Sequence, residues 1–306
     1  DIVATVRKLD ALIEEIRRDY GDPKLRVDVI AHSMGGLIVR YYSRYGTDDV
    51  LGGNAFPVTG AGAVKLRRVA LLGVPHQGAT LAIHRFLNGY QVGISRLPTE
   101  GVATMPALFQ FFPHPAVDWL AGTDGRPIKL DLFDVGTWRQ FEWSIFDRRV
   151  QRRIAQEHDV WPEQAVFERW FEKRLERARR FAWSLMVPAD NLDYREPLNI
   201  GGDCLPTPRR LVVEAIDGES LARLRPEQIS YPVPGIDYEA LMYEPGDGSV
   251  TRSSALAHQQ MDPAVPKHEY SSAGLGRAFF ICEQHDALTG NVSLINNLLL
   301  YLLDAD

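Results

Sequence analysis

The serine in the stretch VIAHSMGGLIVR, residues 29–40, stands where an apolar run gives way to a helical pattern. A serine hydroxyl becomes a nucleophile when a histidine takes its proton and a carboxylate orients that histidine. Ala31 and Gly35, two positions before and after Ser33, favour the tight strand-to-helix turn that exposes such a hydroxyl. Ser33 could instead cap the helix, but the apolar strand before it and the amphipathic helix after it favour the nucleophile elbow.

Eight histidines compete for the role of general base. His285 follows the apolar stretch AFFIC and precedes the last helical stretch, where the base stands when the triad order is Ser, acid, His. His32 adjoins the serine, so its side chain is expected to point away from the Oγ. His76 follows a strand in GVPHQG and is expected to have a structural, hydrogen-bonded role. The others are expected in helices or loops without a strand end: His84, His114, His158, His258 and His268.

Two aspartates compete for the carboxylate that orients the base. Asp203 ends one expected strand in NIGGDC, and Asp247 ends the next in YEPGDGSVTRSSA. Both stand at the carboxyl end of a strand, so position alone leaves the choice between them open.

The elements around these residues predict an α/β class of fold. Apolar residues at helical spacing in residues 1–20 are followed by Gly21 and Pro23, which predicts a helix that ends there. A β-branched run at 27–31, a helix that ends at Gly46, and a second apolar strand from residue 66 come next. This order predicts a mostly parallel sheet with helices on both faces. We expect residues 1–80 and 196–306 to form the core, and residues 81–195 to be a mostly helical insertion.

The insertion is rich in aromatic residues and is expected to be a cap or lid. Its apolar side chains could receive an acyl chain or touch a lipid surface in transient contact with a membrane, but packing of the cap is the favoured interpretation. The residues concerned are Leu108, Phe109, Phe111, Phe112 and Trp119. The stripe Phe167, Trp170, Phe171 and Leu175 is likewise expected to be the buried face of an amphipathic helix.

Composition excludes several classes of protein. The chain has 306 residues, 45% of them hydrophobic and 24% charged, and the net charge of −6 argues against a nucleic-acid binder. No apolar run reaches the length of a transmembrane helix. Cys204 and Cys282 stand far apart, and their spacing suggests neither a disulfide framework nor a zinc site. No metal site or cofactor is expected, and of the possible locations the cytoplasm is favoured.

The chain resembles the lecithin:cholesterol acyltransferase-like family of α/β-hydrolases in several blocks that occur in the family's order. These are AHSMGGLIVRYY, GVPHQGA, TMPALFQFFP, LDLFDVGTW, CLPTPRRLVV, GDGSVTRSSAL and EQHDALTGN, and they span residues 27 to about 303. The resemblance implies an α/β-hydrolase fold with the acid in the G-D-x-[TS]-V block, which is Asp247, with Asp203 as the fallback.

The resemblance also implies a reaction. Ser33, activated by His285 and Asp247, would attack a lipid-like ester, and the acyl group would pass to water or to an alcohol. The backbone N–H of Met34 would donate to the oxyanion together with a second N–H. A short-chain carboxylesterase and a catalytically silent, hydrolase-fold binding module are the alternatives.

One part of the family pattern is not found in this sequence. The second oxyanion donor belongs to a loop upstream of the first helix, and strands that would flank 27–31 are not found either. We therefore expect 27–31 to be an edge strand and the 306 residues to be a C-terminal portion of a longer protein.

Overall fold

The computed structural model describes residues 1–53, 55–157, 161–187, 189, 192, 197–257 and 278–303. The chain divides into two compact units. The first unit comprises Asp1–Gln77, Arg180–Thr207 and Pro245–Asp306, and the second comprises Gly78–Arg179 and Pro208–Glu244. The first boundary lies close to the expected one, but the contacts assign Pro208–Glu244 to the second unit and not to the core.

The first unit is built on a parallel sheet. Its strand order is β1 (Val27–His32), β2 (Leu66–Leu72), β6 (Leu198–Gly202) and β11 (Ala278–Ile281). Every described pair is parallel, so the four carboxyl ends meet at one edge. Among the described residues β1 pairs with β2 alone, as expected for an edge strand, and its Ile30 is 51% exposed.

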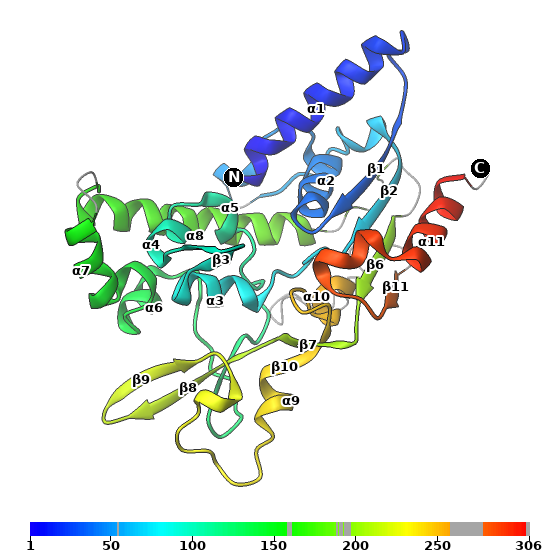
Figure 1. Cartoon of the computed structure of the whole chain (residues 1–306). Helices are drawn as coiled ribbons and strands as arrows, with labels where there is room; N and C mark the ends of the chain where they lie inside the picture. The colour runs from blue at the N-terminus through cyan, green and yellow to red at the C-terminus, as the bar shows by residue number, and fades with distance from the viewer. Residues whose placement is uncertain are drawn as a thin grey trace. The chain divides into compact units, whose positions relative to one another are not determined.

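Helices cover both faces of this sheet (Figure 1). The helix α1 (Ile2–Asp19) begins at Asp1, whose carboxylate accepts from the Ala4 N–H, and packs against α2 (Met34–Tyr45), which contacts β1 and β2. On the other face α11 (Val292–Leu303) packs Leu294 and Leu298 against β2 and β6. The first unit is therefore a mixed α/β structure with a central parallel sheet, as the alternation of helix and strand predicts.

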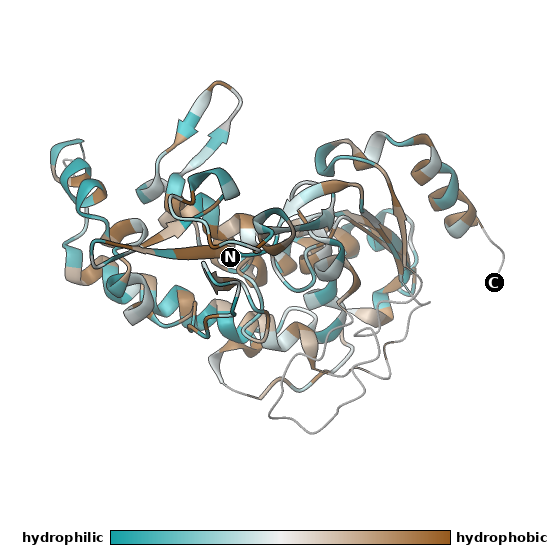
Figure 2. Cartoon of the chain, turned by 90° about the horizontal axis from the view of Figure 1, so that it is seen from below, coloured by the Kyte–Doolittle hydropathy of each residue, from teal (hydrophilic) through white to brown (hydrophobic). Residues whose placement is uncertain are grey.

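The helix α11 is apolar around most of its circumference. Besides its packed face it exposes Leu299, Leu300 and Leu303, at 48%, 72% and 79%. Figure 2 shows this apolar character next to the C-terminus.

The second unit has a helical part and two small sheets. Its helices are α3 (Thr80–Asn88), α4 (Thr99–Ala103), α5 (Pro106–Phe109), α6 (Val135–Gln140), α7 (Arg148–Glu157) and α8 (Gln164–Met186), of which α8 runs on into the first unit. The strands β3 (Tyr90–Val92) and β4 (Ser95–Leu97) form a hairpin. A three-stranded sheet joins β5 (Leu120–Gly122), β8 (Leu211–Ile216) and β9 (Glu219–Arg223). The return of β8 and β9 to this sheet is why Pro208–Glu244 belongs to the second unit.

Aromatic side chains fill the core of the second unit. Phe109 and Phe171 are fully buried, and Phe112 is 2% exposed. Phe109 meets the other two rings edge to face, at a centroid distance of 5.0 Å for Phe171 and 5.8 Å for Phe112. The apolar residues expected either to pack or to meet a lipid are therefore packed within the unit's own core. The stripe on α8 is also confirmed as a buried face, with Phe171 and Leu175 inaccessible.

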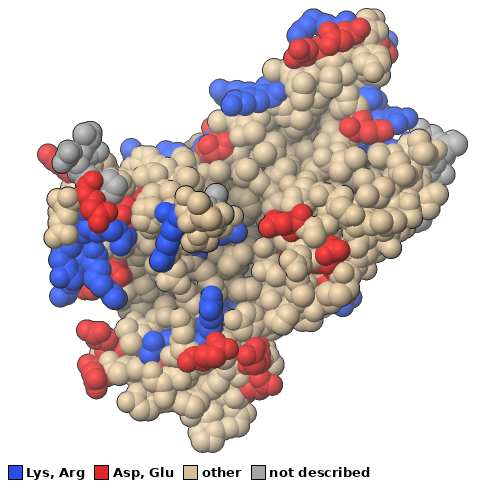
Figure 3. All heavy atoms as spheres, viewed as in Figure 1, with Lys and Arg blue, Asp and Glu red and all other residues tan. Residues whose placement is uncertain are grey.

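Charge is unevenly distributed over the second unit. The helix α7 carries Arg148, Arg149, Arg152 and Arg153, and Figure 3 shows Lys and Arg gathered on the surface in the region of α7. Acidic partners accompany them, since Arg148 pairs with Glu142 at 3.0 Å and Arg153 pairs with the buried Glu100. The cluster is therefore largely neutralised.

Two short strands connect the units. They are β7 (Leu205–Pro208), which is followed by β8, and β10 (Tyr243–Gly246), which leads into Asp247; the two strands pair with each other. The helices α9 (Tyr238–Met242) and α10 (Arg252–Leu256) flank this connection in sequence.

Candidate active site

Ser33 stands at the turn between β1 and α2 in a strained backbone conformation. Its φ is +53° and its ψ is −121°, a region that residues with a Cβ rarely occupy and that costs on the order of 1–3 kcal/mol. The turn is held by the Ser33 N–H, which donates to the Leu72 carbonyl at 2.9 Å, and by the Gly36 N–H, which donates to the Ser33 carbonyl at 3.0 Å. The side chain makes no capping hydrogen bond to the helix. The cap interpretation of Ser33 is therefore wrong.

Small residues allow the close packing of this turn. A Cβ at Gly35 would lie 3.7 Å from the Ala31 Cβ, which is an ordinary van der Waals contact, so the space at this position would also accept an alanine. At Gly36 a Cβ would lie 2.1 Å from a Val74 methyl, a distance that no substitution can accommodate without movement. The second glycine therefore lets α2 approach the end of β2.

His285 and Asp247 complete a continuous chain of hydrogen bonds with Ser33. His285 Nε2 lies 2.9 Å from Ser33 Oγ, and His285 Nδ1 lies 2.8 Å from Asp247 Oδ2. All three residues belong to the first unit and follow its strands β1, β10 and β11. The side chain of His285 is 12% exposed and that of Asp247 is 1% exposed. The structure thus brings together the three residues that the sequence singled out.

Asp247 is fixed on all sides. Its Oδ1 accepts from the N–H groups of Ser249 at 2.9 Å and Val250 at 2.6 Å, which leaves Oδ2 for His285. Its own carbonyl accepts from the His285 N–H at 2.9 Å. Because the carboxylate receives three hydrogen bonds in a nearly dry place, it is preorganised to hold one tautomer of the imidazole.

Asp203 does not take part in this chain. Its side chain is 31% exposed and faces Arg252 at 3.8 Å. The choice that strand position left open is thus decided by geometry in favour of Asp247 as the partner of His285.

Sequence reasoning missed two glycines that make room for Asp247 and His285. A Cβ at Gly73, whose φ is +55°, would lie 3.1 Å from Asp247 Oδ2 and 3.2 Å from His285 Nδ1. A Cβ at Gly202 would lie 2.7 Å from the Asp247 Cβ and 2.6 Å from the Glu283 carbonyl. Gly73 follows β2 and Gly202 ends β6, so both lie at the carboxyl edge of the parallel sheet, where functional sites form. A glycine at the end of an apolar strand is therefore the sequence pattern from which they could have been predicted.

His32 also lies at the site, where its side chain contacts His285 and makes no described hydrogen bond to the Ser33 Oγ. Its Nε2 lies 3.0 Å from the His285 carbonyl oxygen, and the two imidazole rings lie 4.7 Å apart, tilted by 39°. Burial, with a contribution from the neighbouring His285, lowers the pKa of His32 below its usual value. His32 therefore stays neutral at pH 7 and donates its Nε2–H to that carbonyl.

Met34 is the first residue of α2. The first N–H groups of a helix have no acceptor within it, and they carry the positive end of the helix dipole. The Met34 N–H is thus placed next to the Ser33 hydroxyl as an oxyanion donor would be. No contact of the described residues identifies the second donor.

The remaining histidines fall elsewhere. His76 is 4% exposed and lies between Arg40, at 3.1 Å, and Asn199, at 3.4 Å. Burial first, and then the charge of Arg40, lower its pKa well below the usual value, which agrees with the structural role expected for it. His84 and His114 belong to the second unit. His158, His258 and His268 lie outside the described residues.

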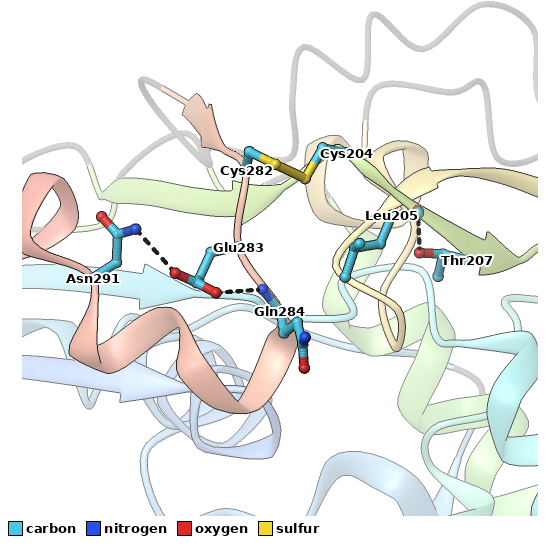
Figure 4. The surroundings of a disulfide bond; sticks show 7 residues. All are labelled: Cys204, Leu205, Thr207, Cys282, Glu283, Gln284 and Asn291. Atoms are coloured by element: carbon cyan, nitrogen blue, oxygen red, sulfur yellow. Dashed lines mark hydrogen bonds between the residues drawn. A yellow bond between two sulfur atoms is a disulfide. The ribbon is translucent and has the colours of Figure 1, made fainter.

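Cys204 and Cys282 form a disulfide, so the interpretation that their spacing suggests no disulfide framework is wrong (Figure 4). They are 78 residues apart in sequence, but β6 and β11 pair in register with Gly202 opposite Ile281. The two cysteines therefore leave the sheet side by side, with a Cα–Cα distance of 5.1 Å that a disulfide can bridge. Disulfides are rare in the reducing cytosol, so the bridge gives no support to a cytoplasmic location.

The bridge stands three residues before His285. Glu283, between them, accepts from the Gln284 N–H at 3.0 Å and from the Asn291 side chain at 3.2 Å (Figure 4). These contacts turn the chain from β11 into the short helical segment that begins at His285. The disulfide and the Glu283 hydrogen bonds thus define the path of the loop that carries His285.

The described residues contain no cluster of three or more His, Cys, Asp or Glu side chains arranged to hold a metal ion. Of the helices described, none combines the length and the apolar character needed to cross a membrane.

Comparisons with known proteins point to the fold alone. No protein-family model matches the chain, and no curated protein matches it significantly. Among solved structures, the crystal structure of the Tle4–Tli4 complex is similar with a TM-score of 0.57 and 13% sequence identity. The match covers 96% of this chain and 64% of that one, so this chain spans less than two thirds of the length of that chain. The likeness supports the mixed α/β architecture over nearly the whole chain.

Proposed function

We propose that this chain is a serine hydrolase of the α/β-hydrolase fold, similar to the lecithin:cholesterol acyltransferase-like family, that acts on a lipid-like ester. The observation that carries the proposal is the relay from Ser33 Oγ to His285 Nε2 and from His285 Nδ1 to Asp247 Oδ2, at 2.9 and 2.8 Å. A strained serine on a strand-to-helix turn, a base within hydrogen-bond reach and a buried carboxylate behind it are the parts that acyl transfer needs.

In the proposed reaction Ser33 Oγ attacks the ester carbonyl carbon while His285 Nε2 takes the hydroxyl proton. The carbonyl oxygen becomes an oxyanion that accepts from the Met34 N–H, and the Asp247 carboxylate stabilises the imidazolium of His285. His285 then returns the proton to the leaving alkoxide, so the alcohol departs and an acyl-enzyme remains on Ser33. Water or an acceptor alcohol, deprotonated by His285, attacks this ester, and Ser33 is regenerated as the acid or the new ester leaves.

The second unit fits the role of a substrate-selecting cap by its connectivity. The chain first enters it after β2, whose partner β1 precedes Ser33 at the same sheet edge. After a return through Arg180–Thr207 and a second excursion, the chain re-enters the first unit at Pro245, two residues before Asp247. Insertions at the carboxyl edge of a parallel sheet are where binding and specificity residues accumulate.

Labelling with a fluorophosphonate probe, which reacts only with an activated serine, tests the proposal. We expect stoichiometric labelling of the full protein at Ser33, none in Ser33→Ala, and normal labelling in a control, Ser220→Ala, which removes an exposed serine of the second unit. An unlabelled wild-type protein, or labelling that survives Ser33→Ala, would overturn the proposal and leave a silent binding module.

Chain-length preference tests the substrate class separately. We expect nitrophenyl esters of long acyl chains to give a higher kcat/KM than acetate or butyrate esters. The reverse order would replace the lipid ester with a short-chain ester, and product analysis with an added alcohol would separate hydrolysis from acyl transfer.

A further inference from the structure

The imidazole of His285 must keep two hydrogen bonds at the same time, one to Asp247 and one to Ser33. Its backbone, however, follows a loop and begins a short helical segment. A base displaced by about 1 Å can lose roughly two orders of magnitude in rate. The peptide group that precedes His285 is fixed, because its N–H donates to the Asp247 carbonyl at 2.9 Å. The peptide group that follows His285 needs a partner of its own.

His32 supplies that partner. Its Nε2 lies 3.0 Å from the His285 carbonyl oxygen, so both peptide groups that flank the base are fixed by hydrogen bonds. The imidazole of His32 also lies against that of His285, with centroids 4.7 Å apart, and thereby limits rotation of the ring. His32 is the last residue of β1, pairs in register with Leu72, and directly precedes Ser33 in the sequence. The base is thus positioned with reference to the strand that carries the nucleophile.

From these contacts we infer that His32 is a positioning residue for His285, which it holds through the Nε2–H hydrogen bond to the His285 carbonyl. The inference rests on the proposed function of Ser33, His285 and Asp247. A neutral ring suits this role, because a charged one would repel the imidazolium that His285 becomes when it takes the serine proton. The lowered pKa of His32 is consistent with this requirement.

Two variants separate the hydrogen bond from the shape of the ring. His32→Leu keeps much of the volume but has no donor, whereas the amide nitrogen of His32→Gln reaches about as far as Nε2 and can still donate. We expect His32→Leu to lower kcat and the fluorophosphonate labelling rate about tenfold with KM nearly unchanged, since one hydrogen bond is lost. We expect His32→Gln to recover most of both rates. His84→Leu, in the second unit, is the control and should label at the wild-type rate.

Thermal unfolding and a nuclear magnetic resonance signature complete the test. A merely structural role would lower the unfolding temperature of His32→Leu but leave the rate per labelled site unchanged, which would refute the inference. Side-chain ¹⁵N shifts should show His32 protonated at Nε2 and bare at Nδ1 at pH 7, and the opposite tautomer would also refute it.

The outcomes distinguish this inference from the proposed function. An unlabelled wild-type protein would remove the function itself. A labelled wild type with an equally fast His32→Leu variant, or a His32→Gln variant no faster than His32→Leu, would remove only the role of His32.

Discussion

Reduction of the Cys204–Cys282 bridge should destabilise the protein by an amount that follows from its place in the chain. The bridge closes a loop with a sequence separation of 78. The chain-entropy relation then gives about 4.5 kcal/mol at 25 °C as the stabilisation through the unfolded state. For cooperative unfolding of 306 residues, at roughly 2.1 cal/mol/K per residue, this corresponds to a Tm lower by roughly 7 °C.

Thermal unfolding followed by intrinsic fluorescence measures this effect. The samples are the wild type with and without a phosphine reductant, and the double variant Cys204→Ser/Cys282→Ser under the same two conditions. We expect the reduced wild type and the double variant to unfold at the same temperature, roughly 7 °C below the oxidised wild type. The reductant should not change the double variant, which makes that variant the control for nonspecific effects.

Two results would refute this reasoning. A thiol assay on the unfolded, unreduced protein should find no free thiol, since the chain has two cysteines and both are paired; two free thiols would show that the bridge does not form. Equal unfolding temperatures for all four samples would show that the cross-link does not constrain the unfolded chain. Because the bridge precedes His285 by three residues, we also expect kcat of the reduced protein to fall at temperatures where it remains folded.

Three further predictions concern the site and the packing around it. Asp247→Asn should lower kcat about 10³–10⁴-fold with little change in KM, because an amide cannot hold the required imidazole tautomer; steady-state kinetics measures this, and a loss below tenfold would contradict the role of Asp247. Gly36→Ala should lower the free energy of unfolding by at least about 1–3 kcal/mol in urea denaturation, because its Cβ would lie 2.1 Å from a Val74 methyl. The control is Gly52→Ala, whose Cβ would meet nothing within 4 Å and which should lower the free energy of unfolding by less than about 1 kcal/mol. His114 is buried, which lowers its pKa to about 3, so the unfolded chain takes up a proton below pH 6.5 that the folded chain does not bind. The contribution of the neutral His114 to the free energy of unfolding should therefore be fully present above pH 6.5. Between pH 6.5 and about 3 the free energy of unfolding should fall by up to about 1.4 kcal/mol per pH unit. Denaturation at several pH values should show a shallower fall in His114→Leu, and an identical slope would refute the assignment.

Much of the site could be predicted from sequence because its features are local. The elbow at Ser33 depends on a strand, a turn and a helix that adjoin in sequence, and the small residues at 31, 35 and 36 leave a recognisable pattern. The place of His285 could also be predicted, because it follows the last apolar strand. Helix α1, strands β1 and β2 and helix α11 were likewise predictable from the spacing of apolar residues.

The remaining features depend on which strands become neighbours. Asp203 and Asp247 both follow strands, and only the contacts at the edge of the sheet show that Asp247 meets His285 while Asp203 meets Arg252. The assignment of Pro208–Glu244 to the second unit depends on the pairing of β8 with β5, whose partner residues Leu211 and Leu120 are far apart in sequence.

The amino-acid sequence by itself determined the strand-to-helix turn at Ser33 and the α/β class, because both follow from patterns among residues that are close together in the chain. Only the tertiary structure showed the contact of Asp247 with His285, the disulfide, the glycines beside these two residues and the contact of His32 with His285. The physical reason is that these depend on the register of parallel strands: it brings Cys204 to Cys282 across 78 residues, and no spacing within the chain encodes that register.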